Sequence, residues 1–382
     1  EFRRVLFRSI KMNFTINRLS LLENLNYVSY AVSTKVQMPG LTGIKFSIRK
    51  DKITLTTNNN EISIQAAITE RFNCIDEGDF IVSGKILFEL IKKLNSKDVD
   101  FMSYDSRTIK LFADKSEYKL TSIDLDSFVE VPFVFSDLKI NLDSLNLKQI
   151  IKKTTFAISN NESRPILAGI SFTTSDNKLE VVATDSYRLA RKTINFGFKF
   201  PTLRVIVPGK SFDALNKIIE DTEENVEIYC TSTYILFKFK NILFQSRLID
   251  GVFPKLDSLI PNKYLSRITF NKEELISIID RLSIFANTGA NNIIKFSLKN
   301  NGMAEFETEE NQLGAAKEEI QPISIENDGN YQISISSKYL LDALHAFDDE
   351  NVHLNFTGEV KPFTITSDKD INLVQLILPL RA

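Results

Sequence analysis

Side chains that bind metals or form disulfides are scarce in this chain of 382 residues, which has two cysteines, two histidines and no tryptophan. Cys74, Cys230, His345 and His353 show no metal-ligand spacing and do not make a Cys/His zinc site by themselves. So few cysteines in a large chain are typical of a reducing cytosol. We therefore expect a cytoplasmic protein without a metal or a cofactor.

Long apolar runs and a strong net charge are also missing. No run of about 18 apolar residues occurs, so no membrane span is expected. The start lacks the long apolar segment and cleavage site of a secretory signal, so secretion is not expected either. The formal net charge of −2 argues against a protein that grips nucleic acid over its whole surface, but it leaves room for one basic face.

The first eleven residues, EFRRVLFRSIK, differ in character from the rest of the chain. Met12 opens the segment MNFTINRLSLLENL, which reads as an ordinary protein start. We interpret residues 1–11 as a non-native or leader extension and leave them out of the fold prediction.

One pattern of helices occurs three times along the chain. Amphipathic stretches begin near Ile16, Leu142 and Phe270, at separations of 126 and 128 residues. A second set begins at 83, 208 and 336, at separations of 125 and 128. In the stretch 147–158, Leu147, Ile150, Ile151, Thr154, Ala157 and Ile158 fall at i, i+3, i+4, i+7, i+10 and i+11, which is the spacing of one helix face. The sequence therefore predicts two helices in each of three repeats.

Strand patterns occupy the segments between these helices. Alternating segments at 52–68, 179–194 and 303–320 predict hairpins, and further strands follow each second helix. Helices that cover an apolar sheet face give a layered α+β domain. We predict an α+β protein of three repeated domains, with antiparallel sheets outside and two helices inside each, at 12–137, 138–262 and 263–382.

Patterns that suggest an enzyme have plainer explanations. Pro208-Gly209-Lys210-Ser211 resembles part of a phosphate-binding loop, but Arg204 stands where a second glycine is needed, and the other repeats place equivalent residues at a helix start. The histidines belong to no Ser/His/Asp arrangement. Paired carboxylates are numerous, but their spacing singles out no pair.

Basic side chains recur on the predicted helices 84–97, 147–158, 210–219 and 272–285. A positive helix face can be a solvated surface, but its repetition on equivalent helices favours a surface that meets phosphates. The lack of interleaved aromatic residues favours contact with a nucleic-acid backbone over base stacking. The candidate phosphate contacts on these helices are Lys92, Lys93, Lys148, Lys152, Lys153, Lys210, Lys217 and Arg281.

Three local segments carry a family resemblance. ATDSYRLA at 183–190 follows a strand, LIDGVFP at 248–254 ends the second repeat, and LPLR at 378–381 ends the chain. Taken singly, they are a hairpin turn, a linker and a closing strand. Together, in this order and at these separations, they resemble the signatures of the bacterial DNA polymerase III beta subunit family, the beta sliding clamps, from Met12 to Ala382.

That resemblance implies a non-catalytic subunit of a DNA-directed DNA polymerase holoenzyme, which acts as a processivity factor in DNA replication. It implies a head-to-tail homodimer that closes a ring around double-stranded DNA, with helices lining the hole and no membrane contact. The implied partners are the DNA polymerase III alpha subunit, the clamp loader ATPase and other proteins with a clamp-binding motif, such as DNA repair polymerases, ligase and mismatch repair factors.

The resemblance also assigns residues. Partners of this family insert a peptide of the form Gln-Leu-x-Leu-Phe into a cleft between the second and third domains, where an apolar pocket takes the anchor side chains. Tyr118, Ile284 and Phe285 would form the dimer contact, and Lys35 and Arg164 would touch DNA. The peptide cleft would use Leu167, Thr184, Ser186, Tyr187, Arg188, Leu189, Pro254, Leu259, Ile377, Leu378, Pro379, Leu380 and Arg381.

Three functions can thus be compared. They are a DNA-encircling processivity factor, an enzyme such as a carboxylate hydrolase on a repeated α+β scaffold, and an adhesive or structural repeat protein. The missing catalytic constellation disfavours the second, and the missing secretion signal disfavours the third.

Overall fold

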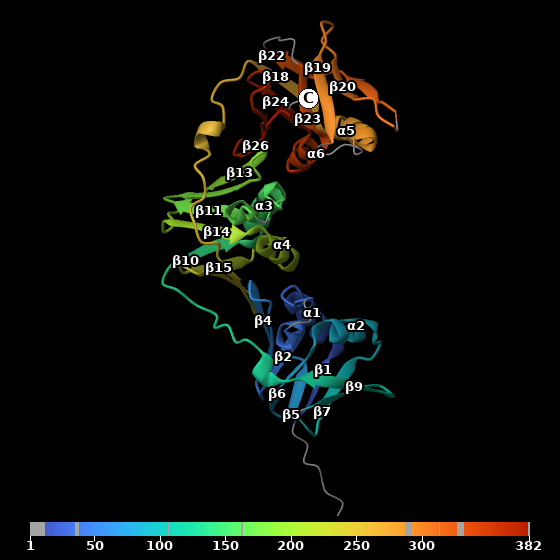
Figure 1. The fold of residues 1–382 in the computed structure, drawn as a ribbon. Helices are drawn as coiled ribbons and strands as arrows, with labels where there is room; N and C mark the ends of the chain where they lie inside the picture. The colour runs from blue at the N-terminus through green and yellow to red at the C-terminus, as the bar shows by residue number, and fades with distance from the viewer. Residues whose placement is uncertain are drawn as a thin grey trace, which may run out of the picture. The chain divides into compact units, whose positions relative to one another are not determined.

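The computed structural model describes residues 12–34, 38–105, 107–161, 163–286, 292–312, 314–326 and 332–380. Residues 1–11, which we interpret as a leader, lie outside this part of the chain. The chain separates into two compact units: residues up to 145 with 217–248 form the first, and residues 146–216 with 249–382 form the second. Each unit contains its own sheets (Figure 1).

The α-helices of the described residues repeat at the predicted separations. The first helix of each repeat begins at Arg18, Ser144 and Lys272, and the second begins at Gly84, Gly209 and Ser337. These starts lie 126, 128, 125 and 128 residues apart, as the sequence predicts. The bounds are α1 (Arg18–Ser29), α2 (Gly84–Lys93), α3 (Ser144–Thr154), α4 (Gly209–Ile218), α5 (Lys272–Ala286) and α6 (Ser337–His345).

Two helices end earlier than predicted. Helix α3 stops at Thr154, and residues 155–157 continue as a single 3-10 turn, η3. The hydroxyls of Thr154 and Thr155 donate hydrogen bonds to the carbonyls of Ile150 and Ile151, at 2.7 and 2.8 Å. Such side-chain donors compete with the backbone ladder of a helix. Helix α2 stops before Leu94, whose backbone is extended.

A thirteen-stranded antiparallel sheet forms the first unit, in the order β10-β15-β16-β17-β4-β3-β2-β6-β9-β8-β7-β1-β5. Helices α1 and α2 pack together in this unit, and α1 also packs on β3 and β4. The strands are β1 (Met12–Asn17), β2 (Gly43–Ile48), β3 (Ile53–Asn58), β4 (Ile62–Ile68), β5 (Phe72–Asp76), β6 (Gly78–Ser83), β7 (Asp98–Ser103), β8 (Thr108–Ala113), β9 (Ser116–Ile123), β10 (Lys139–Asp143), β15 (Asn225–Cys230), β16 (Tyr234–Phe239) and β17 (Ile242–Arg247).

The second unit holds a nine-stranded sheet, β14-β11-β12-β13-β26-β25-β24-β18-β22, and a four-stranded sheet, β21-β20-β19-β23. Helices α5 and α6 pack together and contribute to one apolar core with the strands around them. The strands are β11 (Gly169–Ser175), β12 (Lys178–Thr184), β13 (Arg188–Asn195), β14 (Leu203–Pro208), β18 (Ser266–Asn271), β19 (Ile293–Leu298), β20 (Ala304–Thr308), β21 (Lys317–Ile320), β22 (Ser324–Glu326), β23 (Gln332–Ser336), β24 (Asn351–Phe356), β25 (Phe363–Thr366) and β26 (Leu373–Ile377).

Strand ladders cross both predicted domain boundaries. Strand β4 of the first repeat pairs with β17 of the second, and β13 of the second pairs with β26 of the third. The middle repeat therefore contributes strands to both compact units, and neither unit coincides with one predicted domain. The α+β class and the predicted hairpins are confirmed, whereas the domain limits at 137 and 262 stay a prediction.

The phosphate-loop pattern marks a helix start in the structure. Gly209 is the first residue of α4, and a Cβ atom added there would lie 2.3 Å from Cδ1 of Ile158 and 3.3 Å from the carbonyl oxygen of Ala168. Close packing therefore accounts for this glycine without a bound phosphate.

Gly40 shows a tighter version of the same constraint and yields a prediction. It lies in a 3-10 turn at Pro39–Thr42, and an added Cβ would lie 2.0 Å from the carbonyl oxygen of Ser127. Backbone has no rotamer with which to move away, so Gly40→Ala forces a backbone shift. We expect a loss of about 1–3 kcal/mol in the free energy of unfolding, measured by urea denaturation.

Gly197 provides the matched control, because no atom lies within 4 Å of an added Cβ. We expect Gly197→Ala to stay within about 0.5 kcal/mol of the parent protein. Equal stability of the two variants would contradict the packing assignment at Gly40.

Candidate functional site

The ATDSYRLA segment forms a tight turn between β12 and β13. The Asp185 carboxylate accepts hydrogen bonds from the backbone N–H groups of Tyr187 and Arg188, at 2.9 and 3.0 Å. The Thr184 hydroxyl donates to the carbonyl of Arg188 at 2.6 Å and accepts from the N–H of Ser186. Ser186 adopts φ of 81°, a left-handed conformation that is rare for a side chain other than glycine. Thr184 is buried and maintains the turn, while Tyr187 is 56% exposed.

An apolar floor lies on one face of the β13–β26 pair. Leu189 and Leu376 are direct partners in this ladder, and together with Val182 they form a small buried cluster. Four partly buried side chains pack against it, three from the linker after β17 and one from the C-terminal tail: Phe253, Leu256, Ile260 and Leu378. This cluster is separate from the core of the second unit.

A hollow of about 270 Å³ lies beside this floor, under the linker. Its apolar lining includes Val182, Leu189, Phe253, Leu256 and Ile260. Its polar lining comes from Glu180, Arg191, Arg204, Lys255 and Asp257, among which Arg191 and Asp257 lie 3.6 Å apart as an ion pair. A hollow lined by both apolar and charged side chains has the chemistry to hold a peptide or a small ligand. We call the hollow and its floor the linker cleft.

The C-terminal tail borders the same region. The N–H of Leu378 donates to the carbonyl of Tyr187 at 2.9 Å, so the tail continues beside the β12–β13 turn. The N–H of Leu380 then donates to the carbonyl of Ser334 on β23 at 2.8 Å. Leu378, Pro379 and Leu380 are all half-buried, so the tail presents apolar surface next to the linker cleft.

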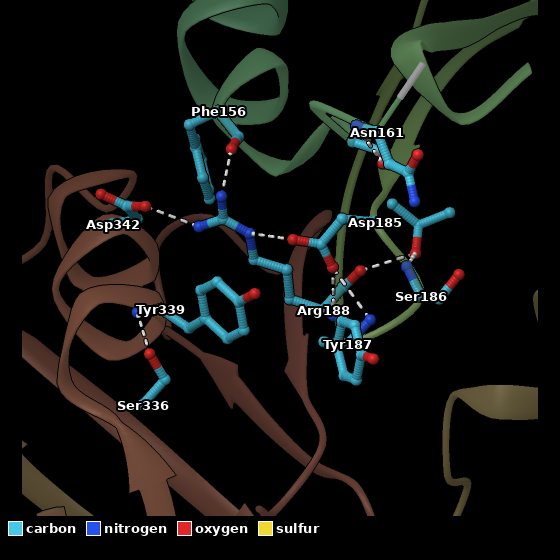
Figure 2. A network of polar contacts seen from close by, with 11 residues as sticks. Phe156, Asn161, Asp185, Ser186, Tyr187, Arg188, Ser336, Tyr339 and Asp342 are labelled. Atoms are coloured by element: carbon cyan, nitrogen blue, oxygen red, sulfur yellow. Dashed lines mark hydrogen bonds and ion pairs between the residues drawn. The ribbon is translucent and has the colours of Figure 1, made fainter. Parts of the chain in front are cut away.

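Arg188 lies on the other face of the β13–β26 pair, because its ladder partner Ile377 belongs to the core of the second unit. Figure 2 shows the polar contacts around Arg188. Its guanidinium donates to Asp185 at 3.0 Å, to Asp342 at 2.6 Å and to the carbonyl of Phe156 at 2.6 Å. The same group lies 4.5 Å from the ring centre of Tyr339 and 5.5 Å from that of Phe156. We call these five residues the Arg188 cluster. The Arg188 side chain at its centre is 9% exposed.

A second group of charges surrounds Asp370, and we call it the lysine–aspartate cluster. The ammonium of Lys153 lies 2.8 Å from both Asp348 and Asp370, and Lys192 also pairs with Asp370. The side chains of Lys153 and Lys192 are 7% and 9% exposed. These residues come from α3, β13 and the two ends of the β24–β25 region, so the cluster joins segments of the second and third repeats.

The lysine–aspartate cluster shifts the pKa values of its members. Burial by itself raises the pKa of Asp370, but hydrogen bonds from Lys153 and Lys192 outweigh it and leave this pKa below its usual range. The hydrogen bond from Lys153 lowers the pKa of Asp348 despite some burial. Burial by itself lowers the pKa of Lys153. Its hydrogen bonds to Asp348 and Asp370 have the larger effect, so the pKa of Lys153 is raised overall.

Several predicted cleft residues are brought together, and two are placed elsewhere. Leu189, Pro254 and Leu378 lie at the linker cleft, whereas Leu167 lies half-buried in the 3-10 turn 165–168 and Leu259 is an exposed linker residue. Ile377 is 1% exposed and packs in the core of the second unit, and its assignment to the cleft stays a prediction. The Arg188 guanidinium donates to Asp185, Asp342 and the carbonyl of Phe156, and the assignment of Arg188 to the cleft stays a prediction. Arg381 lies outside the described residues.

The sequence prediction missed Leu376 as part of the floor, together with Val182, Phe253, Leu256 and Ile260. Successive side chains of a strand point to opposite faces, so Leu376 and Leu378 share a face that Ile377 does not. Strand alternation read from the tail inwards would have identified Leu376.

The predicted phosphate contacts fall into two groups. Lys92, Lys93, Lys152, Lys210 and Lys217 are exposed on α2, α3 and α4, and Lys148 is half-buried. The Lys153 side chain is 7% exposed and pairs with Asp348 and Asp370, and its assignment as a phosphate contact stays a prediction. Arg281 is exposed but pairs with Glu318 at 2.5 Å, and the exposed Arg164 donates to Ser186 at 3.1 Å. Lys35 lies outside the described residues.

The predicted dimer residues lie on two separate surfaces. Tyr118 is half-buried on β9. Ile284 and Phe285 lie at the end of α5, where Ile284 is 64% exposed and Phe285 is half-buried.

A Thr–His–Asp arrangement in the third repeat resembles the triad of a hydrolase. The Oγ1 atom of Thr269 lies 2.9 Å from Nδ1 of His353, and Nε2 of His353 lies 3.0 Å from Asp368. Thr269 and His353 are each 7% exposed on paired strands, so the hydroxyl is closed to a substrate. In the described residues, no group of three or more His, Cys, Asp or Glu side chains is placed to hold a metal ion.

Three family models match the chain in order: the N-terminal domain of the DNA polymerase III beta subunit at 12–132, the central domain at 141–255 and the C-terminal domain at 257–381. The chain belongs to the DNA polymerase III beta subunit family. A beta sliding clamp of Staphylococcus epidermidis (strain ATCC 35984) and one of Staphylococcus aureus (strain Mu50) are each 35% identical over 376 residues, which cover 97% of this chain and 99% of the relative.

Solved structures agree with this assignment. The sliding clamp of Bacillus subtilis is 34% identical with a TM-score of 0.92, and the DNA polymerase III beta chain of Streptococcus pneumoniae TIGR4 is 30% identical with a TM-score of 0.93. Each comparison covers 97% of this chain and 100% of the other. Beta sliding clamps are non-catalytic processivity factors, so the family confirms that this chain is not an enzyme.

Acid should destabilise the second unit through the lysine–aspartate cluster. Asp348 and Asp370 have lowered pKa values in the folded state, so their stabilisation is present above the unfolded value of about 3.9 and is lost as the pH falls through the folded values. We expect the urea concentration at the unfolding midpoint of the parent protein to decrease when the pH is lowered below about 4. In Asp370→Asn this midpoint should depend less on pH.

Asp257→Asn serves as the control, because this carboxylate is 87% exposed and its partner Arg191 lies 3.6 Å away. It should leave the acid dependence unchanged. An equally steep acid transition in Asp370→Asn would contradict the role given to Asp370.

Proposed function

We propose that this chain closes a ring around duplex DNA as a head-to-tail homodimer, and that it tethers the replicative polymerase and other DNA-processing proteins through the linker cleft. The observation that carries the ring is the pairing of equivalent strands across the repeats. A cytoplasmic location follows from this function; no helix in the described residues has the length and apolar character to cross a membrane.

Two strand edges that correspond to the paired edges of these ladders have no partner in the described residues. The last strand of the second repeat, β17, pairs with β4 of the first, and the last strand of the third repeat, β26, pairs with β13 of the second. In the first repeat, the last strand is β9, which corresponds to β17 and β26. In the third repeat, β21 corresponds to β4 of the first repeat and β13 of the second. In the described residues, β21 pairs only with β20, and residues 116–121 of β9 pair only with β8.

A second copy of the chain supplies the missing partner at each edge. Unpaired strand edges are templates for further pairing, and an end-to-end contact that closes on itself gives a ring. If β9 of one subunit pairs with β21 of the other, two chains of three repeats form six equivalent junctions. Tyr118 lies on β9, and α5, which carries the exposed Ile284, packs on β21. This supports the dimer contact inferred from the family.

The exposed lysines support contact with DNA phosphates. Lys92, Lys152 and Lys210 lie on three different helices, and none of them forms an ion pair with another described residue. Mobile lysines contact phosphates without reading base edges, which permits movement along the duplex. Topology then retains the ring on DNA, and high affinity is not needed.

The linker cleft supports the binding of partner peptides. Its apolar floor at Leu189 and Leu376 suits the leucine and phenylalanine anchors of a Gln-Leu-x-Leu-Phe segment, and its polar rim can orient the peptide backbone. The partners proposed on this basis are the DNA polymerase III alpha subunit, the clamp loader ATPase, repair polymerases, ligase and mismatch repair factors.

Retention on DNA tests the ring directly. After loading with the clamp loader ATPase, we expect the protein to remain on nicked circular DNA during gel filtration and to leave the same DNA once it is linearised. Ile284→Asp should place a carboxylate in the dimer contact, give a monomer by light scattering and abolish retention on the circle.

Ile371→Asp is the matched control for this substitution, because Ile371 is 73% exposed and lies outside the proposed contact. It should stay dimeric and be retained. Equal retention of the parent protein on circular and linear DNA would contradict the proposed ring.

Removal of residues 378–382 tests the cleft. The truncated protein loses Leu378 from the floor and the backbone bond to Tyr187, so its affinity for a labelled Gln-Leu-Ser-Leu-Phe peptide should fall about 30-fold or more, equivalent to ~2 kcal/mol. Fluorescence anisotropy measures the affinity, and light scattering should show an intact dimer. Unchanged affinity would mean that partners bind elsewhere.

A further inference from the structure

We propose that the two buried charge clusters behind the β13–β26 pair are positioning groups for the peptide site, and that they set its affinity without touching the peptide. The inference rests on the proposed peptide-binding function. It concerns charged residues that contact the β13–β26 pair on the face opposite Leu189 and Leu376.

The β13–β26 ladder carries different chemistry on its two faces. Leu189 and Leu376 face the linker cleft. Arg188 and Lys192, one residue before and three residues after Leu189, point to the opposite face because side chains alternate along a strand. Their ladder partners Ile377 and Leu373 belong to the core of the second unit, which confirms this orientation. The clusters therefore sit at the two ends of the ladder, directly behind the floor of the cleft.

Each cluster joins the second repeat to the third. In the Arg188 cluster, Arg188, Asp185 and Phe156 belong to the second repeat, whereas Tyr339 and Asp342 belong to α6 of the third (Figure 2). In the lysine–aspartate cluster, Lys153 and Lys192 belong to the second, and Asp348 and Asp370 to the third. The amide of Gln375 on β26 adds a hydrogen bond to the carbonyl of Lys153 at 3.1 Å.

Both clusters are built for fixed geometry. The Arg188 guanidinium is planar, and three acceptors in different directions together with two aromatic rings leave it one orientation. Asp370 receives one lysine on each of its oxygens. Buried ion pairs gain little net stability, since desolvation offsets attraction, but a lost partner leaves an uncompensated charge. The two clusters therefore fix the orientation of the third repeat against the second, and they add little to the free energy of unfolding.

The other intrachain ladder lacks this arrangement. In the β4–β17 pair, Ile62 stands opposite Ser246 and Ala66 opposite Ile242, where the β13–β26 pair has Arg188 and Lys192. Its outer face carries Ser63 opposite Gln245 in place of the two leucines.

The side chain of Gln245 also occupies that outer face. It donates to the carbonyl of Pro132 at 3.0 Å and accepts from the N–H of Val134 at 2.9 Å, so the chain's own linker is bound there. Charges behind the ladder thus accompany the open apolar floor and are absent where the floor is polar and covered.

The shared ladder explains how the clusters act on the site. The walls of the peptide site come from both repeats: Leu189 and the linker from the second, Leu376 and the tail from the third. A small rotation of one repeat against the other would separate these walls. The two clusters restrict that rotation, so the site is formed before a peptide arrives and the ordering cost of binding is low.

The test measures peptide affinity in full-length variants that leave the linker cleft unaltered. With the labelled Gln-Leu-Ser-Leu-Phe peptide, we expect Asp342→Asn and Lys153→Gln each to weaken binding about 5- to 20-fold, the range of a typical coupling between sites. Asp342 is 31% exposed, which leaves room for a longer side chain, so Asp342→Glu should restore affinity to within about two-fold of the parent. A residue with a merely structural role elsewhere would not show this charge-specific rescue.

Lys369→Gln is the matched control, because it removes an exposed lysine next to Asp370. Its affinity should equal that of the parent. Light scattering and thermal unfolding on each variant show whether the dimer and the fold are intact, and Asp342→Glu keeps the test decisive if a neutral variant unfolds.

The outcomes separate the two proposals. If the parent protein binds the peptide and both Asp342→Asn and Lys153→Gln bind it within two-fold, the positioning role is refuted while the peptide site stands. If Asp342→Glu is as weak as Asp342→Asn, the role is refuted as well. If the parent protein itself does not bind the peptide, the proposed peptide-binding function fails.

Discussion

The pairing of β13 with β26 is the constraint on which the second unit depends. Within the described residues it is the one strand ladder between the second and third repeats, and its two faces serve different neighbours. Leu189 and Leu376 make an apolar floor on one face, while Leu373 and Ile377 enter the main core on the other. A shift of one residue in this register would exchange the two faces and destroy both the floor and the core.

The same ladder explains why the two intrachain junctions differ in chemistry despite equal topology. Where the outer face is polar, the Gln245 amide binds the chain's own linker and the junction is closed. Where the outer face is leucine, the linker leaves a hollow, and charges behind the strands restrict movement. The two intrachain ladders of this repeated scaffold thus differ in chemistry because a few side chains differ at equivalent ladder positions.

Lysines on the helices of this chain differ in their exposure to solvent. Lys92, Lys152 and Lys210 are exposed, whereas Lys153, next to Lys152, is buried and pairs with Asp348 and Asp370. Neighbouring residues on a helix point about 100° apart, so adjacent lysines can serve solvent and interior respectively. Charge counted along a helix therefore overstates the charge that a helix presents.

The sequence by itself determined the threefold repeat, the approximate start of each described α-helix, the hairpins and the family, because these follow from local periodicity and from motifs within a few residues. It did not determine which lysine is buried or which tail residue faces the cleft. Lys153 meets Asp370 across 217 positions and Arg188 meets Asp342 across 154, so these partners come from different repeats. Ile377 and Leu376 are both apolar, and only the ladder register decides which of them enters the core. Local pattern encodes the elements, whereas long-range pairing assigns each side chain its neighbours.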